Sequence, residues 1–217
     1  MQALTLYTYF RSSAAFRVRI ALNLKGLDYN SEYVHLLKDG GQEKAAGFRQ
    51  LNPQMLVPAM SVDDQVITQS IAMIEYLDEK YPEPSLMPKD SLDRAHVRAT
   101  ALAIACDIHP LNNLRVLQYL ETQLDVDKEQ RQAWIKHWVS EGFSAIEEML
   151  EKKGMMDFCF GESVTLADIT LIPQVYNANR FACDMDLYPR INRIYQQCME
   201  QPAFIEAAPE NQQDCDI

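Results

Sequence analysis

LTLYTYFRSSAAFRVRIALNLKG, residues 4–26, decides the fold. Its first six residues are aliphatic, aromatic or β-branched, a composition typical of a buried strand. The following residues favour a helix, because Ser12 or Ser13 can cap its start and Gly26 stands where a left-handed C-terminal cap belongs. Apolar side chains recur between these ends at helical spacing. The stretch therefore predicts a strand that leads directly into a helix.

The residues after this helix predict a mixed sheet. Alternation of apolar and polar side chains predicts a second strand, and Gly40-Gly41 then interrupts the pattern. Two short strands and an amphipathic helix complete the order βαβ, connecting segment, ββα. The expected elements are strands at 29–36, 56–61 and 65–68 and a helix at 70–80. This order predicts an α/β domain of the thioredoxin-like type over residues 1–82.

Three prolines between Tyr81 and Pro88 mark a domain boundary. Proline cannot continue a helix, so we expect a stiff extended linker at residues 83–90. Beyond it, periodic stretches without a strand pattern predict an all-helical domain over residues 91–217. The tail from Asn211 is polar and is expected to be frayed. Helices are expected near 91–120, 128–152, 165–180 and 188–200.

Charge and cysteine usage limit the possible functions. The 217 residues include 31 acidic and 20 basic side chains, and the resulting charge of −11 repels nucleic acid and anionic membrane surfaces. Five cysteines without a CxxC pair predict neither a disulfide framework nor a zinc site. The N-terminus lacks the basic and apolar regions of a signal peptide, and no segment is apolar enough to span a membrane. The expectation is a cytoplasmic protein without a metal.

The start of the first helix is one candidate site. Phe10-Arg11-Ser12-Ser13-Ala14 joins strand to helix, where backbone amides and the helix dipole stabilise an anion. A serine hydroxyl there can donate a hydrogen bond to a thiolate. The simpler interpretation, which the local pattern favours, is that Ser12 and Ser13 only cap the helix.

Two other pairs are candidates for ligand binding. A cis bond between Val57 and Pro58 would turn the Val57 backbone outward, ready to pair with a peptide-like ligand. An ordinary edge-strand proline is the alternative. Gln69-Ser70 stands immediately before a predicted helix, where Ser70 can cap that helix and also bind a carboxylate.

Together these motifs resemble one family over nearly the whole chain. RSSxxFRVRIALNLKG, NPxxLVPAM and a Gln-Ser pair followed by IAMIEYLDEKYPEP are similar to the zeta class of glutathione transferases. The resemblance continues through CDIHPLNNLRVLQYL, TLADITLIPQV, NANRF and LYPRI. This class contains maleylacetoacetate isomerase and is related to bacterial maleylpyruvate isomerase. The resemblance implies glutathione as cofactor, a thioredoxin-like N-terminal domain and an all-helical C-terminal domain.

The resemblance also implies which residues are catalytic. It makes Ser12 the residue nearest to the glutathione sulfur, with Ser13 and Arg11 beside it. One departure matters, because the SSC motif that is frequent in the family reads Ser12-Ser13-Ala14 here. Any contribution of that cysteine is therefore absent, but isomerisation can survive because glutathione supplies the nucleophilic sulfur.

By the same resemblance, glutathione contacts come from both domains. Val57 with Pro58 is implied to pair with the cysteinyl backbone of glutathione, whereas Gln69 and Ser70 hold its γ-glutamyl end. A further glutamine contact matches Gln42, although an ungapped count from Asn52 places that role on Glu43. The helical-domain residues implied to reach glutathione or the substrate are His109, Asn113 and Arg115.

Three arginines are candidates for binding an anionic substrate in this acidic protein. A guanidinium fork suits carboxylates, although most arginines are simply solvated. The candidates are Arg11, Arg115 and Arg180, of which Arg11 and Arg180 gain weight from the family pattern. By contrast, Thr165-Leu166-Ala167-Asp168 is interpreted as structural, because threonine followed by aspartate three residues on resembles a capping box.

The activity implied by the resemblance is cis–trans isomerisation of maleylacetoacetate to fumarylacetoacetate in tyrosine and phenylalanine catabolism. The thiolate would add to the double bond of this dicarboxylate, rotation would follow, and elimination would return glutathione unchanged. Maleylpyruvate isomerase, a general glutathione transferase and a non-catalytic adaptor are the alternatives. The residues that argue against the adaptor are Ser12, Gln69, Ser70 and Arg180. The resemblance also implies a homodimer.

Overall fold

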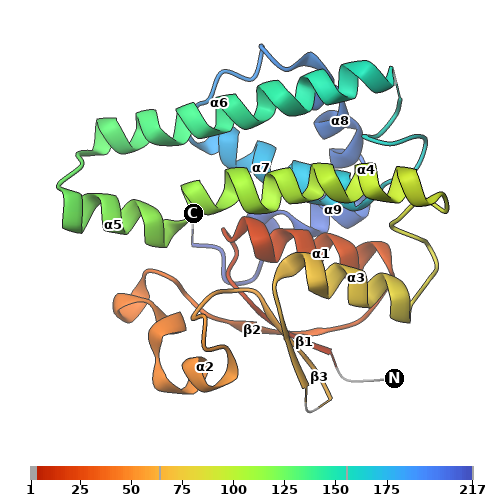
Figure 1. Ribbon diagram of the computed structural model, residues 1–217. Helices are drawn as coiled ribbons and strands as arrows, with labels where there is room; N and C mark the ends of the chain where they lie inside the picture. Colours follow the sequence, from red (N-terminus) through yellow and green to blue (C-terminus); the bar gives the residue numbers. More distant parts are fainter. Residues whose placement is uncertain (1–3, 64, 155, 217) are drawn as a thin grey trace. The chain divides into compact units, whose positions relative to one another are not determined.

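Leu4–Thr8 forms β1, the strand on which the first part of the fold is built (Figure 1). The computed structural model describes residues 4–63, 65–154 and 156–216. β2 (Asn30–Tyr33) pairs parallel to β1, whereas β3 (Ala59–Val62) pairs antiparallel to it and β4 (Gln65–Thr68) antiparallel to β3. The strand order is β2-β1-β3-β4. This parallel unit joined to a hairpin confirms the predicted thioredoxin-like arrangement.

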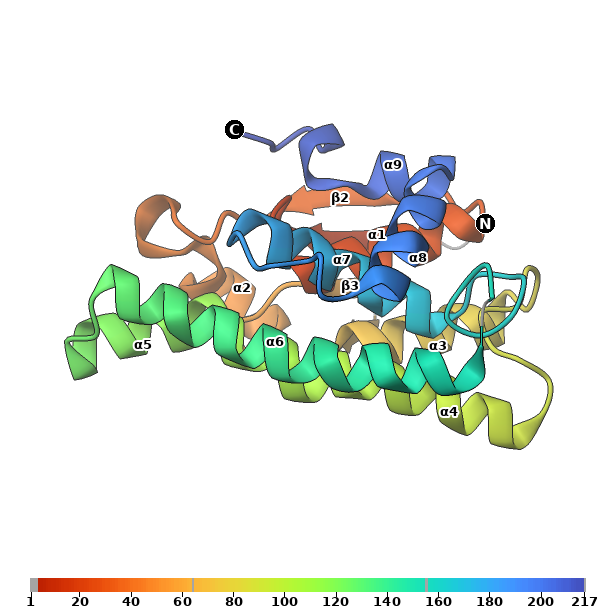
Figure 2. The same ribbon diagram turned by 90° about the horizontal axis from the view of Figure 1, so that it is seen from above.

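Helices pack against this sheet and against each other. α1 (Ser13–Leu24) contacts both α3 (Ser70–Lys80) and α9 (Pro202–Ala207), and Figure 2 shows α9 beside α1. The predicted connecting segment contains α2 (Ala46–Leu51) and two short 3-10 turns, Lys38–Gly40 and Gln42–Lys44. β2 is shorter than the predicted strand at 29–36, because the chain turns away at His35, whose Nδ1 accepts from the amides of Leu37 and Lys38.

The chain forms two compact units, which differ from the predicted domains. One unit contains the residues up to Ser85 and those from Gln201 onward, and the other is Leu86–Glu200. The prediction placed everything from residue 91 in the helical domain. The C-terminal residues instead join the first unit, because α9 packs on α1 and the Asn23 side chain donates to the carbonyl of Ala203.

The tail that follows α9 is bonded, so the expectation of a frayed tail is wrong for the residues described. The Gln212 side chain donates to the carbonyls of Glu206 and Ala208, at 2.8 and 3.0 Å. The Phe10 amide donates to Asp214, and Cys215 packs against a buried cluster that contains Phe10. Polar composition misled the prediction because these side chains find partners on the first unit.

A buried lysine of the first unit holds the segment that precedes the second unit. The Lys25 ammonium is within 2.6 Å of Asp78 Oδ1, 2.7 Å of the Tyr81 carbonyl and 2.6 Å of the Pro84 carbonyl. The Glu83–Pro84 peptide bond is cis. Because all three donors of this ammonium have acceptors, its charge is stabilised although the side chain is buried.

The second unit is helical, as predicted. Its predicted first helix is interrupted, because Pro110 has no amide to donate and the chain passes through a π-helical segment, Ala103–Ile108, and a 3-10 turn, His109–Asn112. α5 and α6 then lie side by side (Figure 1). Among the residues described, no helix is long and apolar enough to cross a membrane. The α-helices are α4 (Ser91–Leu102), α5 (Leu114–Leu124), α6 (Lys128–Lys153), α7 (Leu166–Arg180) and α8 (Pro189–Met199).

The predicted capping box at the start of α7 is confirmed. Asp168 is fully buried, and its Oδ2 accepts from the amide and the hydroxyl of Thr165, at 2.8 and 2.9 Å. Its Oδ1 accepts from the Cys159 amide at 2.7 Å. Burial raises the pKa of Asp168, and these hydrogen bonds oppose the rise. One carboxyl thus joins α7 to the segment before it.

Substitution Asp168→Ala should lower the free energy of unfolding by about 3 kcal/mol, because three buried donors lose the two carboxylate oxygens that accept from them. Asp127→Ala is the matched control, since Asp127 forms an exposed capping box at the start of α6. Its loss should cost about 1 kcal/mol. Urea unfolding of both variants measures the difference, and equal losses would contradict the central role of Asp168.

Candidate active site

Ser12 occupies the position between β1 and α1 that the sequence analysis singled out. It is the N-cap of α1, with φ −69° and ψ 111°, and its Oγ accepts a hydrogen bond from the Ala15 amide at 3.2 Å. Capping uses a lone pair of this hydroxyl and leaves its hydrogen available for donation. Capping and donation to a thiolate are therefore compatible, and the two interpretations of Ser12 do not compete.

The two serines differ in exposure. Ser13 is buried, with 8% of its surface exposed, whereas Ser12 is half-buried. Ala14, which stands where the family frequently has cysteine, is also half-buried. Of the two adjacent hydroxyls, that of Ser12 is the more accessible to a ligand.

A buried arginine lies behind the start of α3. Ser70 is the first residue of α3, and its Oγ accepts a hydrogen bond from Arg17 Nη1 at 3.3 Å. Both side chains are buried, at 6% and 1% exposure. Gln69, the N-cap, is exposed, and its backbone takes the left-handed region with φ 71°. A helix start, a hydroxyl and a guanidinium together suit a carboxylate.

The Val57–Pro58 peptide bond is cis, as the second candidate motif required. The loop before it is organised by Asn52, which is 1% exposed. The Asn52 side chain donates to the Leu56 carbonyl at 2.7 Å and accepts from the Gln54 amide at 3.0 Å. These bonds fix the path of the chain into Val57 and β3.

Within the first unit, contacts link the three candidate motifs. Val57 belongs to one buried cluster with Tyr9, Phe10 and Val34, so the loop before Ser12 packs against the loop that ends at Pro58. Arg17 of α1 in turn contacts Ser70 of α3. Residues far apart in the sequence are therefore brought together at one end of the sheet.

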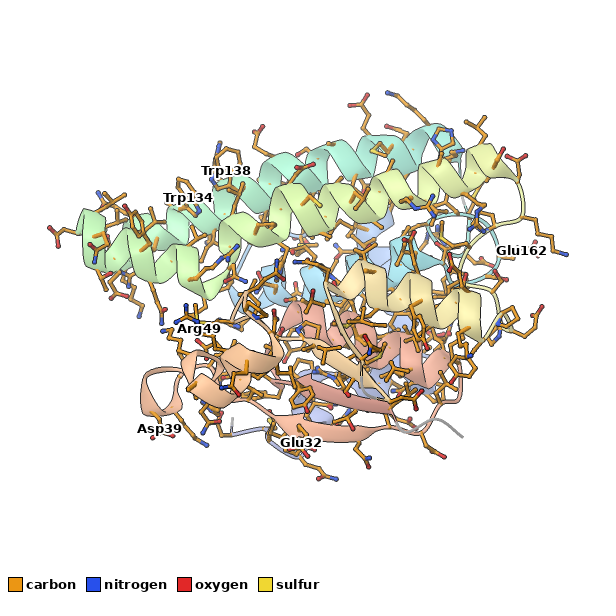
Figure 3. The ribbon with its side chains drawn as sticks, turned by 60° about the horizontal axis from the view of Figure 1, so that its bottom comes forward. Glu32, Asp39, Arg49, Trp134, Trp138 and Glu162 are labelled. Atoms are coloured by element: carbon orange, nitrogen blue, oxygen red, sulfur yellow. The ribbon has the colours of Figure 1, made fainter. Side chains whose placement is uncertain are left out.

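Gln42 and Glu43, the two alternatives for one glutathione contact, lie in the loop after β2. Gln42 Oε1 accepts from the His35 amide at 2.9 Å, and its Nε2 donates to Asp39 Oδ2 at 3.3 Å (Asp39 is labelled in Figure 3). Glu43 is 7% exposed, and its Oε2 has no hydrogen-bond partner among the residues described. Gln42 therefore holds the loop, and Glu43 points a carboxylate inward.

Arg11 faces the C-terminal tail. Its Nη2 lies 3.9 Å from Asp216 Oδ1, and Lys38 Nζ lies 3.8 Å from Oδ2 of the same carboxyl. His35 Nε2 is closer, at 3.1 Å from Oδ2. Because His35 Nδ1 accepts two backbone amides, the Nε2–H tautomer donates to Asp216. One carboxylate thus gathers three basic side chains.

The remaining candidates lie in the second unit. His109 begins the 3-10 turn before α5, and the Asn113 side chain caps α5 by accepting from the Arg115 amide at 3.1 Å. Arg115 is exposed. Arg180 is the last residue of α7, also exposed, with its guanidinium 4.5 Å from the centre of the Phe181 ring. Both arginine residues are exposed.

Sequence analysis missed two buried arginines of α1, Arg17 and Arg19. Arg19 donates from Nε to the Ala207 carbonyl at 2.9 Å, from Nη1 to Thr8 Oγ1 at 3.1 Å and from Nη2 to the Phe10 carbonyl at 3.0 Å. Burial lowers the pKa of Arg19 to about 10, so it stays charged at neutral pH. The sequence did contain a signal for them, because these two charged residues alternate with apolar residues in the segment FRVRIAL of the predicted helix.

A tryptophan of α6 contacts the turn that carries His109. Trp134 and Trp138 are neighbours on α6 (Figure 3), with ring centres 5.6 Å apart, and Trp134 donates to the Leu111 carbonyl. This contact supports the turn that carries His109.

Within the described parts of the chain, no group of three or more His, Cys, Asp or Glu side chains is arranged to hold a metal ion.

The protein thus combines a thioredoxin-like unit, which has a serine at the start of its first helix, with a helical unit. Residues 11–80 match the model of the glutathione S-transferase N-terminal domain, and residues 128–197 match that of the C-terminal domain. The chain belongs to the glutathione S-transferase family.

Relatives within this family include isomerases. A probable maleylacetoacetate isomerase of Vibrio cholerae is 49% identical over 214 residues, which cover 99% of both chains. The holo structure of a bacterial zeta-class maleylpyruvate isomerase has 44% identity and a TM-score of 0.94, covering 97% of this chain and 99% of the other. A maleylacetoacetate isomerase of Methylobacterium extorquens with bound malonate and glutathione has 34% identity and a TM-score of 0.94, covering 98% and 100%.

Replacing His35 with Ala should raise the pKa of Asp216. The hydrogen bond from His35 favours the charged carboxylate and lowers this pKa below its ordinary value, with Lys38 and Arg11 adding to the effect. The contacts of Asp216 therefore stabilise the fold above the ordinary pKa of Asp and are lost as pH falls through the lowered value. Carbon-13 NMR titration measures the shift, and Lys38→Ala should cause a smaller one. An unchanged Asp216 pKa in His35→Ala would contradict the pairing.

Proposed function

We propose that the protein is a glutathione-dependent cis–trans isomerase that converts maleylacetoacetate to fumarylacetoacetate. The observation that carries this proposal is the Ser12 hydroxyl, which caps α1 through its lone pair and keeps its hydrogen for a ligand. It stands at a helix start, where the dipole favours negative charge. An accessible donor in such a place suits a thiolate.

The residues of the first unit fit glutathione. The hydroxyl hydrogen of Ser70 is available to a carboxylate, because its oxygen accepts from the buried cation of Arg17. Gln69 and Ser70 would hold the γ-glutamyl end, and Val57, before the cis peptide bond, would pair with the cysteinyl backbone. Further contacts are proposed for Pro58, Gln42, His109 and Asn113.

When bound, glutathione supplies the thiolate that adds to the cis double bond and later leaves it, so that rotation can occur in between. Ser12 and the start of α1 stabilise the charged sulfur. Lowering a thiol pKa of about 8.5 by about two units requires roughly 2.7 kcal/mol. One hydrogen bond to a charged group together with the helix dipole supplies an energy of this size.

Arginines would bind the two carboxylates of the substrate. Arg11 stands next to Ser12, and Arg115 and Arg180 are exposed residues of the second unit. Their fork geometry suits carboxylates and would stabilise negative charge that develops next to them. Ala14 removes any covalent role of the family cysteine at that position, so the proposed reaction depends on glutathione as the only nucleophile.

The physiological setting is part of the proposal. We assign the enzyme to tyrosine and phenylalanine catabolism in the cytoplasm, acting as a homodimer. Maleylpyruvate isomerase is the second candidate, because a zeta-class structure of that name shares 44% identity and a TM-score of 0.94 with this chain. Parallel assays with maleylacetoacetate and maleylpyruvate separate the two, since the physiological substrate should have the larger kcat/KM.

Substitution Ser12→Ala should reduce isomerase turnover by about tenfold near neutral pH, because the part of the thiol pKa lowering that comes from the Ser12 hydrogen bond is lost while the helix dipole remains. Loss of the cap should cost only about 1 kcal/mol of folding stability. Ser13→Ala is the matched control and should reduce turnover far less. Full turnover of Ser12→Ala with an unchanged thiol pKa of bound glutathione would reduce Ser12 to a cap.

Substitution Arg180→Ala should raise the Michaelis constant for the dicarboxylate about ten- to hundredfold, because a bidentate, charge-assisted contact is lost. The constant for glutathione should change little. Lys128→Ala removes an exposed cation at the start of α6 and controls for the change in net charge. Steady-state kinetics with each ligand varied separately decides the matter. An unchanged dicarboxylate constant would remove Arg180 from the substrate site.

A further inference from the structure

The loop between β1 and α1 has its backbone fixed from two sides. Ser12 donates from its amide to the Tyr9 carbonyl at 2.9 Å, and Arg19 Nη1 and Nη2 donate to the carbonyls of Tyr9 and Phe10 at 3.4 and 3.0 Å. These bonds use acceptors of the loop. Its donor at Phe10 has a different partner, which lies 204 positions further along the chain.

That partner is Asp214 in the C-terminal tail. The Phe10 amide donates to Asp214 Oδ2 at 3.0 Å, and Asp214 is one of the groups that favour the charged form of Arg19 against its burial. The carboxylate and the guanidinium thus hold the same two-residue segment, one by its amide and the other by its carbonyls. Ser12 follows this segment after a single residue.

The tail residues around Asp214 are also bonded to the first unit. Tyr33 donates from its hydroxyl to Gln213 Oε1 at 3.3 Å, and Cys215 packs against the cluster that contains Phe10 and Val57. Asp216 accepts from His35 at 3.1 Å. Four consecutive tail residues therefore contact the rest of the first unit, and two of them, Asp214 and Cys215, do so at the loop before Ser12 and at the cluster that contains Val57.

We propose that Asp214 is a positioning residue for thiol activation, acting through the Phe10 amide to set the place of the Ser12 hydroxyl. This inference rests on the proposed role of Ser12 toward glutathione. A hydrogen bond to a thiolate weakens steeply with distance and angle, so a small shift of the Tyr9–Ser12 loop reduces thiolate stabilisation. The tail then contributes to the chemistry without touching the reacting atoms.

A test of the role of Asp214 should change this residue alone and leave the other charged side chains around the loop as they are. Substituting Asp214 by Asn removes the charge but keeps an oxygen for the Phe10 amide, and Asp214 Oδ1 has no hydrogen-bond partner in the described structure that would be lost. Substituting it by Ala removes both. The charged or titratable side chains near the loop include Tyr9, Arg11, Arg17, Arg19, Tyr29, Tyr33, His35, Lys38, Asp214, Cys215 and Asp216.

The test is a pH titration of the thiolate absorbance of glutathione bound to each variant, together with the pH profile of kcat. Asp214→Ala should raise the thiol pKa by about one unit and lower kcat about tenfold below that pKa, with recovery at higher pH. The Michaelis constant for glutathione should change by less than about threefold. Asp214→Asn should restore most of the activity.

Asp184→Ala is the matched control, because Asp184 also accepts a backbone amide, from Asp186 at 3.2 Å, but lies on the second unit. It should leave the thiol pKa unchanged. If Asp214→Ala does not fold, Asp214→Glu keeps the charge, displaces the acceptor by one methylene and should cause a smaller shift of the same sign. A lower melting temperature with an unchanged pH profile in the folded variant would overturn the proposal. An undepressed thiol pKa in the unsubstituted protein would instead overturn the role of Ser12, and with it this inference.

Discussion

The buried guanidinium of Arg19 is the interaction on which the rest of the first unit depends. A charge in the interior is tolerated only when its donors have acceptors, and Arg19 donates to a side chain of β1, to the β1–α1 loop and to the end of α9. It therefore joins the first strand, the first helix and the C-terminal segment. The bond from Arg19 to Ala207 spans 188 positions of the sequence, so the first unit depends on contacts between distant segments of the chain.

The site that results is built mainly from groups that stabilise negative charge. Ser12 stands at the start of α1, and Ser70 stands at the start of α3 with the Arg17 cation behind it. Each hydroxyl accepts one hydrogen bond from the protein and keeps its hydrogen for a ligand. In the function that we propose, this arrangement would let an acidic protein with a net charge of −11 bind anionic ligands at one end of its sheet.

Local sequence patterns predicted the elements of the fold because strand alternation, proline and capping residues act over short distances. A cap at Ser12 or Ser13 and the Thr165–Asp168 box followed from neighbouring residues, whereas the cis bond at Pro58 was one of two alternatives that those residues left open. The interruption near Pro110 was missed, because helical periodicity continued on both sides of it. The tail was missed for a different reason, because the partners of Asp214 and Asp216 lie about two hundred residues away in the chain. No local pattern reports such a contact.

The most direct test follows substrate, product and free thiol in one reaction. A small amount of the unsubstituted protein is mixed with maleylacetoacetate and a known concentration of glutathione, and a parallel reaction omits glutathione. Our account predicts many turnovers to fumarylacetoacetate with the thiol concentration unchanged, and no enzyme-dependent turnover without glutathione. Consumption of one thiol per molecule of substrate, or equal turnover in the absence of glutathione, would contradict it.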